Sequence, residues 1–137
     1  YLPWTDCCFP RALYHQNRLV MDIQGQAKIL RIFISSTDKF RHTPLYEVIV
    51  YAAKRYDLAG ATVLKGTMGF GTSSVIHSQK FWEVSEKLPL VVEIVDEAEK
   101  IDRFTETLLP YFDKIRTGCM ITSEKTDIIL HKRGRRS

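Results

Sequence analysis

A glycine-rich stretch between residues 60 and 74 has the residue types best suited to binding a ligand. Glycines let the backbone approach a bound molecule closely, and successive N–H groups can form a nest for an anion. A lysine adds positive charge, and two serines add hydroxyl groups. The candidate ligand-binding residues here are Lys65, Gly66, Gly69, Gly71, Ser73 and Ser74. The alternative is that these glycines only form bulges where a strand leaves its sheet.

The glycine spacing excludes two familiar nucleotide motifs. Gly66, Gly69 and Gly71 give GxxGxG, which is neither a P-loop nor a dinucleotide fingerprint, and no helix pattern follows immediately. Further along the chain, Arg116 and Gly118 end a predicted helix. Ordinary C-capping explains this pair, although Arg116 also has the charge to contact a phosphate.

The histidines and cysteines do not form a pattern typical of catalysis or metal binding. His77 has no nearby Cys, Asp or Glu that would complete a nucleophile–base–orienter set. The four histidines lack metal-ligand spacing, so we expect no metal site. Three cysteines are an odd number and do not indicate a disulfide framework. Cys119 lies in an apolar stretch and is expected to be a buried, inert thiol.

Length and composition favour a single folded domain. The chain has 137 residues, 45% hydrophobic and 26% charged, which is ordinary for a globular protein with its own core. No window approaches eighteen uncharged apolar residues, and the first residues do not resemble a signal peptide, so we expect a cytoplasmic location and no membrane insertion.

The positive net charge of +4 is concentrated at the C-terminus. Removing the four basic residues of the tail leaves 16 Lys and Arg against 16 Asp and Glu. These four are Lys132, Arg133, Arg135 and Arg136. A solvated tail is the simpler interpretation, and a phosphate-contacting arm is the alternative. A neutral body argues against nucleic-acid binding.

Hydrophobic periodicity predicts the elements of the first half. Residues 28–34 form a β-rich run that predicts a strand. Thr43 as N-cap and Pro44 at the first helical position predict a helix that ends before Gly60. Its apolar face is Leu45, Val48, Ile49, Ala52, Ala53 and Tyr56. Residues 61–68 predict a second strand, and residues 69–87 form a long loop of the kind that is often functional.

The second half predicts three more strands and a helix. Residues 90–95 predict a central strand, and Asp96 is expected to cap a helix. The apolar face of this helix is Ala98, Ile101, Phe104, Leu108 and Phe112. Pro110 predicts a kink or an early stop near Leu109. Residues 119–122 and 126–130 predict a fourth strand and a short fifth one.

The element order predicts an α+β fold of the ferredoxin-like split βαβ type. An antiparallel sheet carries two helices on one face, and its other face is bare in a single copy, so we expect other subunits, rather than a ligand, to cover it. Residues 1–24 are expected to be an irregular N-terminal extension, with Met21 as an alternative start. Residues 25–131 form the domain, and residues 132–137 form the basic tail.

Two other classes share this element order. RNA-recognition domains carry exposed aromatics on the first and third strands, but here the third strand has none and the first offers only Phe33. An acylphosphatase-like hydrolase needs an arginine after the first strand and an asparagine that places water. Arg41 is available, but Asn17 is the only asparagine and lies outside the predicted domain. Both classes are therefore disfavoured.

Several motifs, in order, resemble the PII-like proteins of the domain-of-unknown-function 190 (UPF0166) family. The first is Pro44-Leu45-Tyr46-Glu47, which opens the first helix. The glycine-rich stretch supplies the next two, Gly60 to Gly66 and Gly69-Phe70-Gly71. Ser85 to Asp96, followed by Glu99-Lys100-Ile101, extends the resemblance. It covers roughly residues 28–131.

This resemblance implies a regulatory protein rather than an enzyme. It implies a ferredoxin-like subunit in a homotrimer, with adenine nucleotides in clefts between subunits and a long loop that contacts a partner protein or transporter. The cleft would be lined by residues 66–74, and the loop would follow Gly71. The partner-loop residues would be Thr72, Val75, His77 and Lys80.

The chain departs from PII proteins in two places. PII proteins hold phosphates with a Gly-Asp-Gly-Lys loop before the fourth strand, whereas this chain has Arg116-Thr117-Gly118-Cys119 there. Arg116 and Gly118 are therefore the candidate replacements, or the ligand differs. The loop also lacks the tyrosine that PII proteins can have modified. An adaptor trimer with an empty cleft is the main alternative function.

Overall fold

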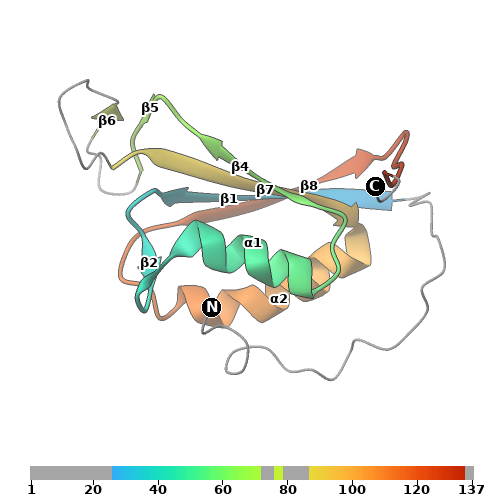
Figure 1. Cartoon of the computed structure of the whole chain (residues 1–137), viewed down its shortest axis with the longest axis horizontal. Helices are drawn as coiled ribbons and strands as arrows, with labels where there is room; N and C mark the ends of the chain where they lie inside the picture. The colour runs from blue at the N-terminus through green and yellow to red at the C-terminus, as the bar shows by residue number, and fades with distance from the viewer. Residues whose placement is uncertain (1–25, 72–75, 79–86, 135–137) are drawn as a thin grey trace.

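Four strands form one antiparallel sheet in the order β4–β7–β1–β8 (Figure 1). The computed structural model describes residues 26–71, 76–78 and 87–134. The sheet strands are β1 (Gln26–Ser35), β4 (Ala61–Lys65), β7 (Pro89–Glu97) and β8 (Met120–Asp127). Two helices, α1 (Leu45–Arg55) and α2 (Ala98–Phe112), complete the domain. Two short pairs flank it: β2 (Lys39–Phe40) with β3 (Thr43–Pro44), and β5 (Met68–Gly69) with β6 (His77–Ser78).

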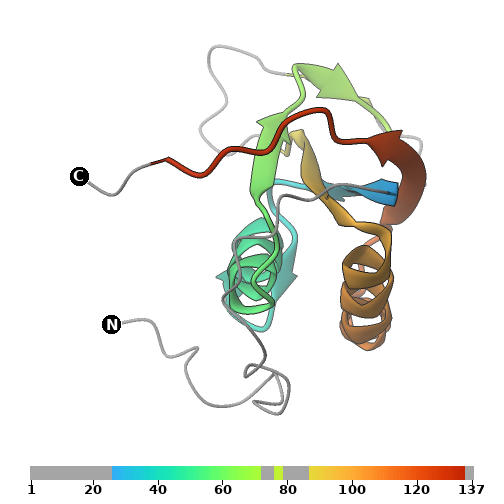
Figure 2. The ribbon, with the colours of Figure 1, turned by 90° about the vertical axis from the view of Figure 1, so that its right-hand side faces the viewer.

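Both helices lie under one face of the sheet (Figure 2). Alternate residues of the central strands point toward them, as period 2 requires. In β7, Leu90, Val92 and Ile94 are buried, and in β1 Leu30 and Ile32 are buried. The predicted α+β, ferredoxin-like architecture is therefore confirmed. Among the described residues, no helix is long and apolar enough to cross a membrane.

Helix α1 buries the predicted apolar face but begins differently. Leu45, Ile49, Ala52 and Ala53 are all buried. The N-cap is Pro44 and not Thr43, and it makes no side-chain capping bond. The preceding turn does the capping instead, because the Leu45 N–H donates to the Asp38 carbonyl at 2.8 Å.

Helix α2 corrects two predictions. Its N-cap is Glu97, the last residue of β7, whereas Asp96 lies one residue earlier in the strand and is completely buried. Pro110 lies inside the helix, which continues to Phe112, so the early stop predicted near Leu109 does not occur. Pro110 is exposed and lies in the last turn of α2, where the missing N–H removes one backbone hydrogen bond.

The C-terminal third of the chain differs from two further predictions, one about strands and one about Cys119. A single strand, β8, replaces the two predicted strands, because it pairs with β1 continuously from Met120 to Asp127. Residues 128–130 are not a strand. Cys119 is exposed and not buried, because it precedes β8 at the edge of the sheet rather than within the core.

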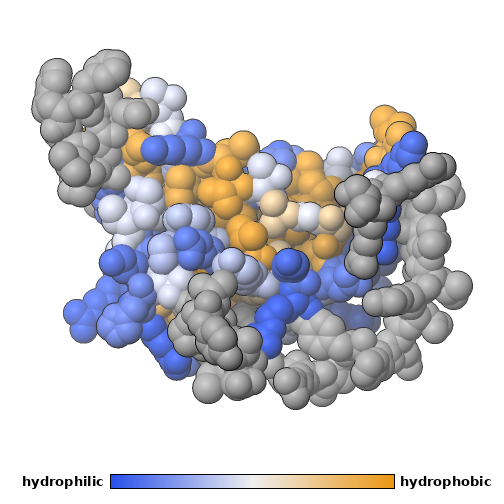
Figure 3. All heavy atoms as spheres, viewed as in Figure 1, coloured by the Kyte–Doolittle hydropathy of each residue, from blue (hydrophilic) through white to orange (hydrophobic). Residues whose placement is uncertain are grey.

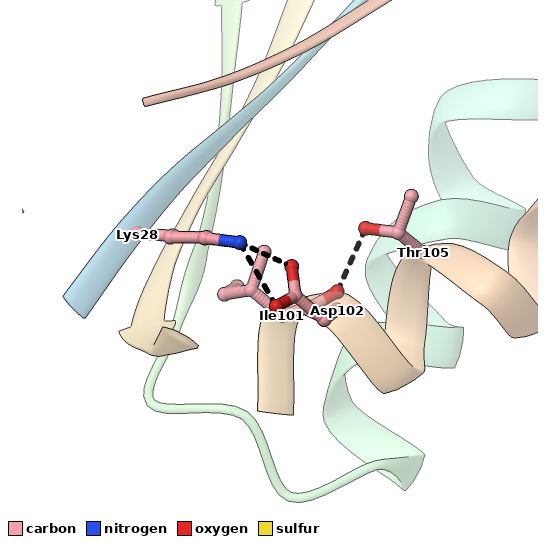
Figure 4. Close-up of polar contacts among 4 residues, drawn as sticks. All are labelled: Lys28, Ile101, Asp102 and Thr105. Carbon is pink, nitrogen blue, oxygen red and sulfur yellow. Dashed lines mark hydrogen bonds and ion pairs between the residues drawn. The ribbon is translucent and has the colours of Figure 1, made fainter. Parts of the chain in front are cut away.

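An ion pair attaches α2 to β1 (Figure 4). Lys28 Nζ lies 2.6 Å and 2.8 Å from the two carboxylate oxygens of Asp102. One turn along the helix, the Thr105 hydroxyl donates to the Ile101 carbonyl at 2.7 Å. The neighbouring Ile101 is completely buried beneath the sheet. Polar contacts thus flank the apolar seam between helix and sheet.

Candidate functional site

Residues 66–71 follow β4, and we call this segment the glycine-rich exit. It packs closely against Pro89, the first residue of β7. The Gly66 N–H donates to the Pro89 carbonyl at 2.7 Å. A Cβ on Gly66 would lie 2.7 Å from Pro89 Cγ, and a Cβ on Gly69 would lie 3.2 Å from the same atom. Close backbone approach therefore explains why glycine stands at Gly66. It also means that the Gly66 N–H is not free to bind a ligand.

Gly71 has a different environment. A Cβ there would meet nothing within 4 Å, and the residue is exposed. Neither Gly66, Gly69 nor Gly71 has a left-handed φ. The expected nest, which alternates right- and left-handed residues, is therefore not formed by these three glycines. Lys65 is also exposed and makes no ion pair with any described residue.

A short hairpin base follows this exit. Met68 and Gly69 of β5 pair with Ser78 and His77 of β6, so the intervening chain leaves and returns at one place. Figure 1 shows this pair projecting beyond the end of the sheet. The flanking Phe70 and Ile76 are exposed. Several predicted loop residues lie outside the described residues, as does the side chain of His77: Thr72, Ser73, Ser74, Val75 and Lys80.

The second half of the predicted site lies at the opposite edge of the sheet. Arg116 and Gly118 are exposed and directly precede β8, whereas the glycine-rich exit follows β4. Strand register places both at the same end, since Lys65 pairs with Leu90 and Phe33 pairs with Met120. However, β7 and β1 separate these edges. Three strand spacings amount to about 14 Å. In a single copy, the two halves are therefore separated by the width of the sheet.

The turn between β1 and β2 holds an unusual carboxylate at this end of the sheet. Asp38 is buried, and its Oδ2 accepts a hydrogen bond from the Ser35 N–H at 2.8 Å. Its Oδ1 has no hydrogen-bond partner among the described residues. Partial burial raises the pKa of the Cys119 thiol, and the Asp38 charge raises it further. Both effects oppose formation of the Cys119 thiolate, which is the reactive form of a cysteine.

Two of the alternative chemistries can be compared with the described residues. Arg41, the arginine that an acylphosphatase-like reaction would use, lies over the Phe40 ring with its guanidinium carbon 5.6 Å from the ring centre. Asn17 lies outside the described residues. Within the described ranges, no group of three or more His, Cys, Asp or Glu residues could hold a metal ion.

The sheet face away from the helices, which we call the open face, is apolar with a charged centre. Phe33, Leu64 and Met120 are 38%, 50% and 60% exposed. Between the strands, Arg31 pairs with Glu93 at 2.8 Å and with Glu124 at 2.7 Å. These hydrogen bonds to Glu124 and Glu93 raise the pKa of Arg31. The sequence predicted a bare face. It did not predict that Arg31 would lie between two glutamates, because these contacts depend on strand register.

The ferredoxin-like fold of this chain is shared with solved PII-like proteins. CPII, a nitrogen regulatory PII-like protein from Thiomonas intermedia K12 whose structure holds ADP, AMP and bicarbonate, aligns with a TM-score of 0.53 at 14% identity, covering 76% of this chain and 91% of that one. A putative PII-like signaling protein from Thermus thermophilus aligns with a TM-score of 0.56 at 20% identity, covering 80% and 94%. At these identities the likeness shows the fold.

Sequence comparison shows the family. The family model DUF190 (Uncharacterized ACR, COG1993) matches residues 27–128. A UPF0166 protein of Aquifex aeolicus (strain VF5) is 38% identical over 102 residues, 74% of this chain and 92% of that protein. A UPF0166 protein of Methanocaldococcus jannaschii is 40% identical over 78 residues, 57% of this chain and 71% of that protein. The chain therefore belongs to the DUF190 (UPF0166) family, as its motifs indicated.

Proposed function

We propose that this protein is a PII-like regulator that binds a small anionic metabolite between the subunits of a homotrimer. An adenine nucleotide is the first candidate. The observation that carries the proposal is the position of the two predicted half-sites. The glycine-rich exit and the segment with Arg116 and Gly118 before β8, which we call the Arg116 loop, lie at the same end of the sheet but at opposite edges. In a ring of copies, a neighbouring copy would bring one next to the other.

A ring of identical subunits satisfies this requirement. In a head-to-tail ring, one edge of each copy faces the opposite edge of the next. Each interface then contains one glycine-rich exit and one Arg116 loop, so a trimer has three equivalent sites. The open face, with its exposed apolar residues and paired charges, supplies area for association.

The choice of nucleotide is supported by chemistry and by a structural neighbour. Lys65 and Arg116 are exposed cations without an ion-pair partner among the described residues, and both suit phosphate groups. CPII, which shares the fold, was crystallised with ADP and AMP. These points make adenine nucleotides the first probes to use.

The hairpin of β5 and β6 would carry the signal. A ligand beside Gly71 contacts the base of this hairpin, and it changes the hairpin's affinity for a partner protein or transporter only if it binds one hairpin conformation better than another. The mechanism needs no catalytic residue, because ligand binding only shifts a conformational equilibrium and the ligand is not chemically changed.

One observation favours the adaptor trimer as a second candidate. Packing against Pro89 accounts for Gly66 and Gly69 without any ligand. In an adaptor, the cleft stays empty and the hairpin binds its partner constitutively. A partner captured equally well with and without every tested nucleotide would favour this function.

The test compares two glycine variants in a thermal-shift and calorimetry panel. Gly71→Val places a side chain in open space at the proposed site, and Gly60→Val does the same beyond the other end of β4. The probes are ATP, ADP, AMP, cyclic nucleotides, 2-oxoglutarate and bicarbonate. A ligand at about 100 times its dissociation constant stabilises the fold by about 2.7 kcal/mol. We expect stabilisation of the parent and of Gly60→Val, and loss of binding in Gly71→Val. Equal binding by Gly71→Val would refute the site.

A further inference from the structure

A short segment after β8 extends away from the body of the protein. We call residues 128–134 the C-terminal arm. Figure 1 shows the arm on the side of the sheet away from the helices, and Figure 2 shows it turning after β8 and crossing toward the β4 side. Figure 3 shows apolar atoms that stand clear of the surface at this end of the molecule. Ile129 is 98% exposed and Leu130 is 80% exposed. Single exposed apolar residues are normal, but two consecutive ones form a contiguous apolar patch that is suited to binding another surface.

The charges of the arm complement those of the open face. On the open face, Arg31 is a single positive charge between two acids, Glu93 and Glu124, so this ion pair carries an excess negative charge. On the arm, Lys132 and Arg133 follow the two apolar residues and are exposed. An apolar segment followed by basic residues therefore matches an apolar face with an acidic centre.

We propose that the C-terminal arm of one copy packs on the open face of a neighbouring copy. The arm does not bury its apolar residues on its own chain, where Ile129 and Leu130 stay exposed. Both complementary surfaces belong to the same chain, so each copy offers one arm and one face, as a head-to-tail ring requires. The inference rests on the proposed trimer and adds the contact that holds it together. Residues 129–134 lie beyond the range that the family model matches.

Photo-crosslinking tests where the arm lies. Leu130 is replaced by p-benzoylphenylalanine in the full chain, and the variant is mixed with unmodified chains labelled with ¹⁵N, with subunits exchanged before irradiation. Mass spectrometry then separates crosslinks between copies from crosslinks within one copy. We expect crosslinks between copies to peptides of β1, β4, β7 or β8. Crosslinks confined to one copy, or joining the arm to α1 or α2, would overturn the proposal.

Sedimentation equilibrium tests the energetic role of the arm. The double variant Ile129→Ser/Leu130→Ser removes two exposed apolar side chains, so the monomer fold is expected to survive. The matched control is Leu109→Ser, which removes a half-exposed leucine from α2 on the other layer of the molecule. We expect the trimer dissociation constant to rise at least about tenfold for the arm variant and to stay near the parent value for the control.

The outcomes separate this inference from the proposed function. A parent trimer that the arm variant leaves equally stable overturns the arm contact and leaves the trimer in place. A parent chain that stays monomeric at every concentration overturns both. The charge-reversal variant Lys132→Glu/Arg133→Glu adds an independent test: it should weaken association most at low salt, because screening already weakens these charges at high salt. No change at low salt would count against charge complementarity.

Discussion

At the scale of single residues, Asp96 is structurally important, but its role differs from the one that the local sequence pattern predicted. The sequence suggested a helix N-cap. In the fold, Asp96 is completely buried at the end of β7. Its Oδ2 accepts the Ala59 N–H at 2.9 Å and its Oδ1 accepts the Glu97 N–H at 2.7 Å. One carboxylate therefore joins the segment after α1 to the start of α2.

We expect Asp96→Ala to destabilise the protein by about 2–4 kcal/mol. The substitution leaves two backbone N–H groups without their acceptor in a partly buried setting. Urea unfolding measures the loss. Asp102→Ala is the control, because it removes an ion pair whose aspartate is 54% exposed, and it should cost less than about 1 kcal/mol. Equal losses for the two variants would contradict this account of Asp96.

The Cys119 thiol gives a prediction of pH dependence. Although Cys119 is exposed, partial desolvation of its thiol and, to a smaller extent, the Asp38 charge raise its pKa, so at a given pH less thiolate is present than for an ordinary cysteine. Asp38→Asn removes the smaller cause, so the pKa should fall and alkylation at pH 8 should become faster. Iodoacetamide labelling in a Cys7→Ser/Cys8→Ser background measures this rate. A rate that is unchanged or lower would show that the Asp38 charge does not act on Cys119.

At the scale of elements, the exit of β4 is controlled by one close contact with β7. The chain passes so near Pro89 that Gly66 has no room for a side chain, and the Gly66 N–H bonds to the Pro89 carbonyl. This contact positions β5 and the hairpin that follows. The glycine pattern was visible in the sequence, but the residue that makes it necessary is 23 positions away.

Gly66→Ala is therefore expected to cost about 1–3 kcal/mol, because its Cβ would lie 2.7 Å from Pro89 Cγ and 3.2 Å from the Pro89 carbonyl oxygen. Gly60→Ala is the matched control at the start of β4, where a Cβ meets nothing within 4 Å. It should be neutral or should stabilise by about 0.4–1 kcal/mol, because alanine restricts the unfolded chain. Thermal unfolding compares the pair, and a neutral Gly66→Ala would disprove the tight contact.

At the scale of the whole molecule, the sheet width separates the two halves of the proposed site. This separation predicts complementation between two defective variants. Gly71→Val impairs one half and Arg116→Ala impairs the other, so each variant alone should lose nucleotide binding. In a mixed trimer, one interface combines an intact half from each kind of subunit.

Calorimetry on an equal mixture with exchanged subunits should recover about a quarter of the parent's binding sites, since random assembly leaves one intact interface in each mixed trimer. A control mixture of Gly71→Val with the double variant Gly71→Val/Arg116→Ala contains no intact interface and should not bind. Failure of the first mixture to recover any binding would place both halves in one subunit.

The local sequence determined much of the architecture. The β-rich apolar runs at residues 28–34 and 90–95 and the helical period after Pro44 depend only on near neighbours, so these elements and the ferredoxin-like class were predictable. The ordered motifs also indicated the family. One error arose where tertiary contacts overrode local preference, at Asp96 in β7. Another arose at Pro110, which is exposed in the last turn of α2 and does not end the helix.

Only the tertiary structure determined the extent of β8, the contacts on the open face and the positions of the two half-sites. Local periodicity does not specify how distant strands pair. Continuous pairing with β1 extended β8 to Asp127 and left Cys119 exposed at the edge. Register brought Arg31 to Glu93 and Glu124 on the open face. Strand order placed Gly71 and Arg116 on opposite edges, and this separation is the physical reason for seeking the site between two copies.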